Sequence, residues 1–321
     1  MPDDAPLLEH VACNLCGTDD YRVVYPARYE RAPHEDLASV FRSSGDEVLI
    51  DQLVRCKACG LQYLNPRLLR DLIVDGYRRG TDEAFVSQNH ARERTSDGCL
   101  ATIEARAGIR RGQLVDVGTA AGAFLAAARK RGWTVAGCEL NEWLCRQAEE
   151  QYGLTVVPGT IFDMKLDRES VDLVTLWDVL EHTTDPAAIL PECHRALRPG
   201  GVIAINYPDI GSLVARLMGR RWVFLLSVHL YYYTAATMAR LLETRGFEPF
   251  FSRPHWQTLE LGYILTRAGA YAPGLVAPVK RLVRLLGMDQ VQIPYWMGQT
   301  LVLARKPRAV AGSAGSERGR E

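Results

Sequence analysis

The sequence lacks the features that mark several large classes of protein. No apolar run approaches the roughly 18 to 20 residues that a membrane-spanning helix needs, and the longest candidate, Trp222 to Val228, is far too short. The N-terminus, MPDDAPLLEH, is acidic and has no charged segment followed by an apolar block, so we expect no signal peptide and a cytoplasmic protein. With 47% hydrophobic and 24% charged residues, the composition excludes a disordered chain, a coiled coil, collagen and a disulfide mini-protein.

A net charge is absent as well, since 38 basic and 38 acidic side chains cancel over the 321 residues. The balance conceals a gradient along the chain. Residues 1–210 hold 23 basic and 32 acidic groups, net −9, whereas residues 211–308 hold 13 basic and 4 acidic groups, net +9. Such a split can mark the place where an anionic partner binds. Arginine outnumbers lysine by 33 to 5, which we attribute to genome composition and not to nucleic-acid binding.

The cysteines indicate a metal site near the N-terminus. Cys13 and Cys16 form one Cys-x-x-Cys pair, and Cys56 and Cys59 form a second, each pair followed by glycine. Two such pairs can hold one zinc ion in a closed four-thiolate site, which is structural and not catalytic. The segment between them is longer than usual, so the site needs an inserted loop. We predict a zinc-ribbon module over residues 1–66; reduced or redox-active cysteines are the alternative.

Short β-branched segments alternate with helical patterns from Gln113 to Asn206. This alternation predicts a parallel sheet covered by helices. Asn141 suits the N-cap of one of these helices, and Gly153 follows its end. The sequence therefore predicts an α/β domain after the ribbon.

The segments on either side of this region complete the expected organisation. Residues 67–110 are charged and predict a helical linker. The segments 247–252 and 299–306 resemble the two last strands of a sheet, with an insertion at about 254–298 between them. Residues 309–321 are rich in Gly, Ser, Arg and Glu, and we expect them to be disordered.

A glycine turn follows the first strand, in DVGTAAG (116–122). Glycine after a buried parallel strand lets the backbone turn tightly and approach a ligand at the carboxyl edge of the sheet. A dinucleotide site would have G-x-G-x-x-G, and the acid at this strand end would repel a pyrophosphate but suits a cation. Glu139 ends the second strand, 23 residues after Asp116, where a carboxylate can accept both hydroxyls of a ribose.

These motifs resemble those of the class I S-adenosylmethionine-dependent methyltransferases. DVGTAAG matches the first motif of that family, with Ala120 where glycine is more usual, and Glu139 matches its acidic ribose ligand. DLVTLWDVLEH (172–182) matches the strand-four block and LRPGG (197–201) the turn before strand five. The resemblance implies S-adenosylmethionine as cofactor and six cofactor-binding residues, namely Asp116, Gly118, Gly122, Glu139, Asp163 and Asp178.

The resemblance also implies a fold and a class of function. It predicts a Rossmann-like, mostly parallel seven-stranded sheet with helices on both faces, in a methyltransferase domain spanning residues 111–308. CKACGLQYLNPR (56–67) resembles the N-terminal module of bacterial methyltransferases that act on sugars, polysaccharide precursors and secondary metabolites. We therefore expect a small-molecule acceptor, most simply a hydroxyl of an activated sugar, glycan precursor or natural product. The +9 region favours an anionic or carrier-linked acceptor, with Arg220 and Arg221 as candidates to receive a phosphate.

Two histidines are candidates for the base that takes the proton of an oxygen acceptor. His229 lies in SVHLYYYT (227–234), and sugar methyltransferases carry a similar histidine–aromatic block. In the C-methylating type a glutamate precedes this histidine, whereas Val228 stands here, which favours O-methylation; sugar C-methylation stays an alternative. His182 follows Glu181 in the strand-four loop, and its other possible role is a structural hydrogen bond. The three tyrosines after His229 either line an acceptor pocket or pack.

Other functions stay open at this point. Some quinone-precursor O-methyltransferases carry an acid-x-x-Glu-His run like the one from Asp178 to His182, and bind a divalent ion that activates a phenol; magnesium would suit the oxygen ligands. A cofactor-binding scaffold in a biosynthetic cluster is the non-enzyme alternative. Nucleic-acid methylation is not expected, because no Asn-Pro-Pro-Tyr-type block follows strand four. PVKRLVRLLG (278–287) is a lid, a peripheral membrane contact or a packed amphipathic helix.

Overall fold

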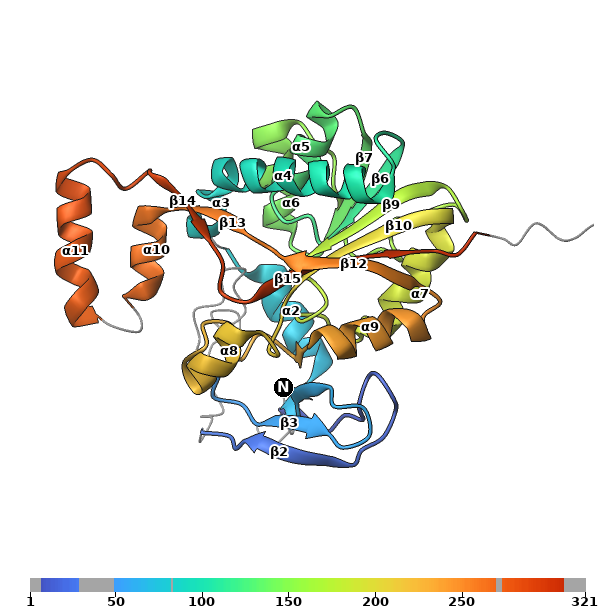
Figure 1. Ribbon diagram of the computed structural model, residues 1–321, viewed down its shortest axis with the longest axis horizontal. Coiled ribbons are helices and arrows are strands. Elements are labelled where there is room, and N and C mark those ends of the chain that lie inside the picture. Colours follow the sequence, from blue (N-terminus) through green and yellow to red (C-terminus); the bar gives the residue numbers. More distant parts are fainter. Residues whose placement is uncertain (1–6, 29–48, 82, 270–272, 309–321) are drawn as a thin grey trace, which may run out of the picture.

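The computed structural model describes residues 7–28, 49–81, 83–269 and 273–308. Its centre is a seven-stranded sheet (Figure 1), built from β6 (Gln113–Val117), β7 (Thr134–Glu139), β8 (Val157–Pro158), β9 (Val171–Trp177), β10 (Leu197–Pro208), β12 (Glu248–Pro254) and β15 (Gln299–Arg305). The spatial order is β12-β15-β10-β9-β6-β7-β8. Only β15 runs antiparallel to its neighbours within this sheet. The predicted tail, 309–321, lies outside the described residues.

Helices cover both faces of the sheet, as predicted. The helices in chain order are α2 (Arg70–Arg79), α3 (Glu83–Val86), α4 (Asn89–Ala107), α5 (Ala123–Lys130), α6 (Glu142–Tyr152), α7 (Pro186–Ala196), α8 (Leu213–Met218), a 3-10 turn (Gly219–Arg221) and α9 (Ala235–Thr244). Figure 1 shows α4, α5 and α6 on one side of the sheet and α7 and α9 on the other. These features confirm the predicted Rossmann-like α/β fold.

Alternating strand residues divide the interior into two cores. Leu114 and Leu173 point to the side of α4 and α5 and join one hydrophobic cluster. Their neighbours Val115 and Val174 point to the opposite side and join a second cluster, which also contains side chains of α7 and α9. This alternation is the period of two that a strand imposes on its side chains, and it explains why both faces of β6 and β9 carry apolar residues.

The N-terminal module is a small sheet that shares a core with the domain. Its strands are β2 (Tyr21–Tyr25), β3 (Leu53–Cys56), β4 (Gln62–Leu64) and β11 (Tyr231–Tyr232), in the order β11-β4-β3-β2. A two-residue pair, β1 (Leu8–Glu9) with β5 (Arg67–Leu68), lies beside it. The fourth strand thus comes from a segment that the sequence assigns to the methyltransferase domain. The domain boundary at residue 66 stays a prediction. Buried side chains that precede and follow this residue in the chain belong to one hydrophobic cluster.

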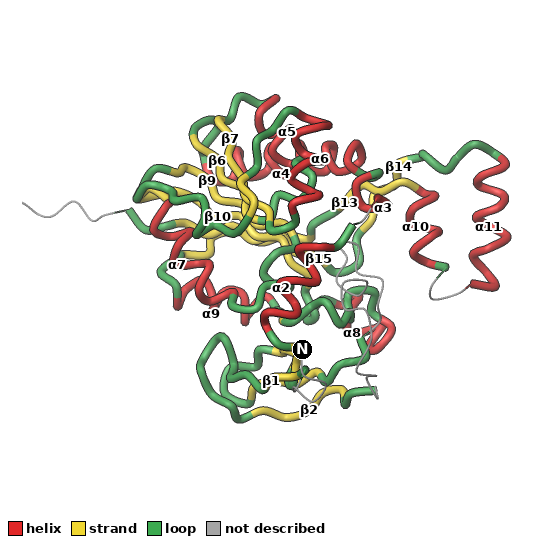
Figure 2. The backbone as a smooth tube through the Cα atoms, turned by 180° about the vertical axis from the view of Figure 1, so that it is seen from behind, coloured by secondary structure: helices red, strands yellow, loops and turns green. Residues whose placement is uncertain are grey.

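The insertion between β12 and β15 folds into a hairpin and two helices. β13 (Gln257–Glu260) pairs with β14 (Gln292–Tyr295), and between them lie α10 (Leu261–Ala268) and α11 (Pro273–Leu285). Figures 1 and 2 show both helices projecting from one end of the molecule, with α11 outermost. Within the described ranges, no helix combines the length and the apolar character that crossing a bilayer requires.

Candidate functional site

A cavity of about 970 Å³ lies at the carboxyl edge of the parallel strands. The turns after β6, β7, β8 and β9 form its floor, and α2, α4 and the insertion contribute to its walls. Ligands bind at this edge in open α/β sheets because the strand-to-helix turns present backbone groups there. The cavity is therefore the place at which the predicted site residues have to meet.

The glycine turn after β6 adopts the conformation that its motif predicts. Gly118 has φ of +69°, and a Cβ there would lie 2.7 Å from Cγ2 of Val179. Gly122 has φ of +81°, and a Cβ there would approach that of Ala148 to 3.0 Å. Both positions therefore require glycine. Ala120 also has a positive φ, +48°, so alanine occupies a left-handed position that favours glycine.

Glu139 presents a fixed carboxyl group at the end of β7. The side chain is buried and lines the cavity. One carboxyl oxygen accepts the backbone N–H of Ala120 and the other that of Asn141, each at 2.9 Å. Burial raises the pKa of Glu139 to about 7. Since each oxygen keeps a further lone pair, the group can still accept hydrogen bonds from a ligand.

Two aspartates also line the cavity and are tied to the sheet. Asp116 is buried and accepts the hydroxyl of Thr175 at 2.5 Å. Asp178 accepts the side-chain amide of Asn206 at 2.7 Å. Burial raises the pKa of each carboxyl to about 7, although the charge of Arg92 opposes this at Asp178. Each group is thus held in place at the cavity by one neighbouring strand.

Asp163 is the predicted cofactor contact that does not reach the cavity. Its exposed side chain turns back on its own loop and accepts the N–H and the hydroxyl of Thr160, at 2.7 and 2.8 Å. These bonds hold the pKa of Asp163 below its usual range. The neighbours Ile161 and Phe162 line the cavity instead. A role for Asp163 as a contact of the adenine stays a prediction.

The two predicted base candidates lie together in the cavity wall. Nδ1 of His182 lies 3.1 Å from the carbonyl oxygen of Val228, and Nδ1 of His229 lies 2.9 Å from that of Phe224. A carbonyl only accepts, so both Nδ1 atoms donate and both Nε2 atoms are acceptors in the neutral rings. The rings meet edge to face, with centroids 4.6 Å apart. Burial lowers the pKa of His182 to about 4 and that of His229 well below its ordinary value.

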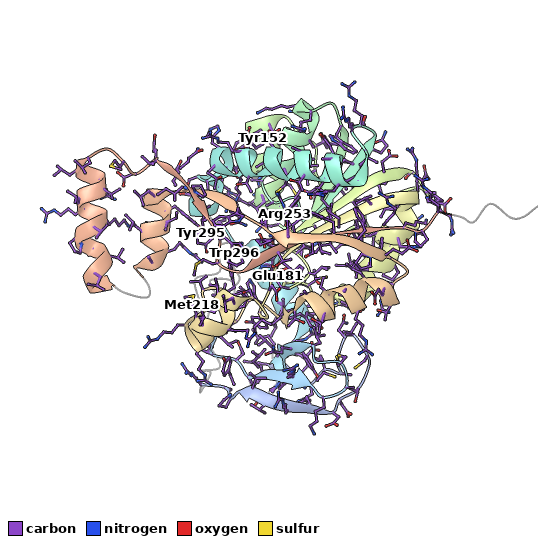
Figure 3. The ribbon with its side chains drawn as sticks, in the orientation of Figure 1. Tyr152, Glu181, Met218, Arg253, Tyr295 and Trp296 are labelled. Carbon is purple, nitrogen blue, oxygen red and sulfur yellow. The ribbon has the colours of Figure 1, made fainter. Side chains whose placement is uncertain are left out.

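Glu181, which the sequence offered only as part of the possible metal-binding run from Asp178 to His182, is a functional candidate in the structure. Its carboxyl is buried, lines the cavity and has no hydrogen-bond partner among the described residues. One of its oxygens and one ring nitrogen each of His182 and His229 all lie within 4.8 Å of one another. We call these three residues the Glu–His cluster; Figure 3 labels Glu181 near the centre of the molecule. Burial and the neighbouring Asp178 raise the pKa of Glu181 well above its ordinary value.

Arg220 and Arg221 are not the cations of this site. The guanidinium of Arg220 lies over the ring of Tyr25, 4.4 Å from its centroid, and neither arginine lines the cavity. The arginines that do line it come from three separate elements, namely Arg70 on α2, Arg92 on α4 and Arg267 on α10. The sequence could not indicate this set, because its members are far apart along the chain.

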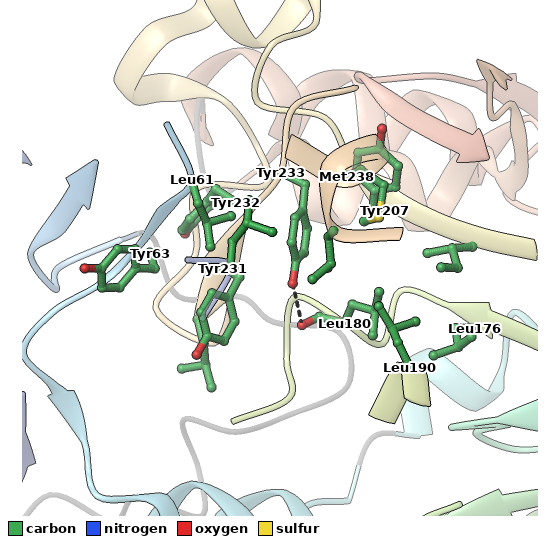
Figure 4. Packing of buried hydrophobic residues seen from close by; sticks show 14 of the residues in the cluster. Leu61, Tyr63, Leu176, Leu180, Leu190, Tyr207, Tyr231, Tyr232, Tyr233 and Met238 are labelled. Carbon is green, nitrogen blue, oxygen red and sulfur yellow. Dashed lines mark hydrogen bonds between the residues drawn. The ribbon is translucent and has the colours of Figure 1, made fainter. Parts of the chain in front are cut away.

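The tyrosines after His229 pack and do not line the cavity. All three are buried (Figure 4). The hydroxyl of Tyr232 donates to the carbonyl of Leu226 at 2.7 Å, and that of Tyr233 to the carbonyl of Leu180 at 3.5 Å. Of the two roles considered for these residues, the structure thus supports packing, which fixes the chain directly after His229.

The four cysteines of the two pairs converge on one point. Their sulfur atoms all lie within 4.8 Å of one another, with Cys13 and Cys59 3.4 Å apart and Cys16 and Cys56 3.5 Å apart. Zinc–sulfur bonds of about 2.3 Å in a tetrahedron place sulfurs about 3.8 Å apart, so this spacing fits one ion. The glycine after each pair has a positive φ and donates its N–H to the carbonyl of the first cysteine. The donor set therefore suits a structural zinc ion.

Comparisons with known proteins agree with this geometry. A family model described as a methyltransferase domain matches residues 89–250. Over 110 residues the chain is 30% identical to the ubiquinone biosynthesis O-methyltransferase of Pseudomonas aeruginosa, a match that covers 32% of this chain and 47% of that protein. Over 149 residues it is 32% identical to the protein of the same name from Methylococcus capsulatus, covering 41% of this chain and 62% of that protein. The chain spans about half the length of the curated relatives it matches.

A solved structure shows the same fold. The complex between the Haloferax volcanii methyltransferase activator Trm112 and a methyltransferase contains a chain that is similar with a TM-score of 0.50 and 18% identity, over 71% of this chain and 96% of that chain. At this identity the likeness concerns the fold alone. The family match covers half of the chain and includes the glycine turn, Glu139 and the strand-four block. The chain therefore belongs to the methyltransferase domain family, with the class I S-adenosylmethionine-dependent fold that its sequence predicted.

Proposed function

We propose that the protein transfers the methyl group of S-adenosylmethionine to a hydroxyl oxygen of a small-molecule acceptor. The observation that carries this proposal is that one cavity joins the glycine turn and Glu139 at one side to the Glu–His cluster at the other. When bound, the cofactor supplies a methyl group on a sulfonium sulfur, and the thioether that is released when the carbon–sulfur bond breaks is a good leaving group. Positioning of the two reactants therefore does most of the catalytic work.

The residues of the cavity floor suit the cofactor. The turn through Gly118 and Gly122 admits a ligand close to the backbone, and Glu139 offers acceptors for the ribose hydroxyls. Asp178 adds a carboxyl group to the same wall, which suits a positively charged amino group or sulfonium. These assignments follow the sequence prediction, and the closeness of the three groups in one cavity supports them.

His229 is our preferred base. Its Nε2 atom is an acceptor, and its Nδ1–H is held by the carbonyl of Phe224. As the acceptor oxygen bonds to the methyl carbon, its proton passes to Nε2, and the hydrogen bond at Nδ1 stabilises the imidazolium that forms. His182 has the same arrangement on the carbonyl of Val228 and is the second candidate.

An activated sugar, glycan precursor or natural product is the acceptor class that we favour. The support is the presence of Arg70, Arg92 and Arg267 in the cavity wall, since three guanidinium groups suit an anionic or carrier-linked acceptor. Sugar C-methylation is a further possibility for the same site. A screen of nucleotide-linked sugars and phosphorylated carriers, read by mass spectrometry for a gain of one methyl group, identifies the acceptor and the methylated atom.

Glu139→Ala is expected to weaken S-adenosylmethionine binding at least tenfold, as measured by calorimetry. Charged hydrogen bonds are worth about 1.5–3 kcal/mol each, and the variant removes the acceptor for the ribose. Glu149→Ala is the matched control, because this exposed carboxylate on α6 does not line the cavity. An unchanged affinity in Glu139→Ala would show that the site map is wrong. If the wild-type chain bound no S-adenosylmethionine, the scaffold alternative would replace the enzyme.

The pH dependence of cofactor binding tests the same role of Glu139. Its pKa is about 7 because the carboxyl is buried, and its charge in turn helps to raise the pKa of Asp116 on β6. A ribose that donates to the carboxylate favours the charged form, so binding releases a proton when the pH lies below 7. We expect the affinity to rise with pH up to about 7 and to level off above it. This rise should be weaker in Glu139→Ala.

A metal-assisted O-methyltransferase is the second candidate, and the convergence of the Glu–His cluster favours it. Asp178, the first acid of the run considered in the sequence, is not part of this cluster; it bonds to Asn206. We expect methyl transfer to be unchanged after treatment with EDTA, with the zinc content monitored separately. Loss of activity that magnesium restores would instead establish metal assistance and remove His229 as the base.

A further inference from the structure

Helix α11 carries a concentrated apolar face at the outer end of the molecule. Of the thirteen large apolar side chains that are exposed among the described residues, seven lie between 275 and 291. Four of them recur at helical spacing on or just beyond α11, namely Leu275, Val279, Leu282 and Leu286. We call these four side chains the α11 face. Leu275 is 76% exposed and Leu282 is 55% exposed, so nothing in the described structure covers this face.

All the charged side chains of helix α11 are positive. Lys280, Arg281 and Arg284 lie on the same helix, and no acidic residue occurs between Leu261 and Met288. None of the three cations forms an ion pair with another residue in the described ranges. By helical spacing the three cations lie on the other side of α11 from the α11 face. A helix with an apolar face and a basic polar face is typical of segments that lie in the surface of a bilayer.

We propose that α11 docks the protein on an anionic phospholipid bilayer. The alternative occupant, a second copy of this chain, would cover the leucines but would offer the three cations no anionic partner on α11, which carries no acidic residue. A bilayer with anionic lipids instead attracts these cations while the leucines enter the acyl boundary. Docking of this kind is peripheral, in keeping with the lack of a membrane-crossing helix in the described part of the chain.

The position of α11 links this surface to the cavity. α11 packs against α10, with Val283 buried. The side chains Tyr263, Ile264 and Arg267 of α10 line the cavity. A docked α11 would therefore hold one wall of the cavity next to the bilayer, where an acceptor carried on a lipid could enter. This last step rests on the proposed function, whereas the docking itself does not.

Sedimentation with vesicles tests the docking on the full chain. We expect the wild-type protein to bind vesicles of phosphatidylcholine with phosphatidylglycerol, and to bind vesicles of phosphatidylcholine alone much more weakly. Arg281→Glu combined with Arg284→Glu should reduce binding at least tenfold, because each basic residue near an anionic surface contributes roughly fivefold. Leu282→Glu combined with Leu286→Glu should reduce it at least tenfold by removing the apolar anchor. High salt should weaken the wild-type binding.

The matched control is Arg110→Glu combined with Arg146→Glu, which makes the same change of charge at exposed positions of other elements. Equal loss in this control, or no binding by the wild type, would overturn the proposal. So would a dimer, seen by light scattering, that the leucine variants dissociate. Every variant should keep the wild-type affinity for S-adenosylmethionine. Vesicle binding without cofactor binding would refute the proposed function and leave the docking intact, and the reverse result would refute the docking alone.

Discussion

His229→Asn is expected to lower kcat by roughly 10²- to 10³-fold, the size of a general-base contribution. Asparagine keeps an N–H that can donate to the carbonyl of Phe224, so the local fold is retained. It lacks the basic Nε2 atom that accepts the proton of the acceptor hydroxyl. The affinity for S-adenosylmethionine should stay within about threefold of wild type, because Glu139 and the glycine turn are untouched.

His182→Asn separates the two candidate bases, since it makes the same change at the partner ring and keeps a donor for the carbonyl of Val228. We expect a smaller loss in kcat than for His229→Asn. The control is His194→Asn, because His194 packs on Phe247 and does not line the cavity. A large loss in His182→Asn with little loss in His229→Asn would transfer the role to His182. If both variants kept wild-type kcat, neither histidine would be the base.

The sequence predicted the sheet well because its signals are local. β6 and β9 are short, mostly apolar segments, and both lie in the region from Gln113 to Asn206 for which the sequence predicted alternating strands and helices. Asn141 caps α6 as expected, its side chain accepting two backbone N–H groups, and Gly153 ends the helix with φ of +57°. Such signals depend only on residues a few positions apart. The glycine turn after β6 was predictable for the same reason.

The parts that could not be predicted depend on contacts between distant segments. β11 is only two residues long and pairs with β4, more than 160 residues earlier in the chain, so its own sequence gives no strand signal. The sequence placed Glu181 in a possible metal-binding run with Asp178 and His182, but only the fold buries its carboxyl beside both His182 and His229. The arginines that line the cavity come from α2, α4 and α10, and nothing in the sequence indicates that these three helices border the same cavity.

The unpredicted strand β11 gives the N-terminal module a specific role at the site. The chain that leads to His229 is tied to the N-terminal module by backbone hydrogen bonds, from Leu49 N–H to the carbonyl of Leu225 and from Leu64 N–H to that of Leu230. Leu230 in turn donates its N–H to the carbonyl of Glu181. The module thus holds His229 from one side while the strand-four loop holds it from the other. The glycine turn after β6 and Glu139 at the end of β7, by contrast, take part in none of these bonds.

Cys56→Ser combined with Cys59→Ser is therefore expected to abolish zinc binding and to lower kcat by at least tenfold, with a much smaller change in cofactor affinity. Two of the four thiolates are lost, and structural zinc supplies about 10 kcal/mol or more of folding free energy to small modules. The pairing of β4 with β11 should then fail, and His229 should lose its fixed position. Zinc content by mass spectrometry, kcat and calorimetry with S-adenosylmethionine measure the three effects.

Cys193→Ser is the matched control, because this cysteine is buried in the core outside the zinc-binding group. It should lose some stability but keep both zinc and kcat. A zinc-free variant with wild-type kcat would show that the module does not position His229. Wild-type protein that contained no zinc would favour the alternative of reduced or redox-active cysteines. A parallel loss of cofactor affinity and kcat would mean that the module supports the whole domain, with which it shares the hydrophobic cluster on the side of α7 and α9.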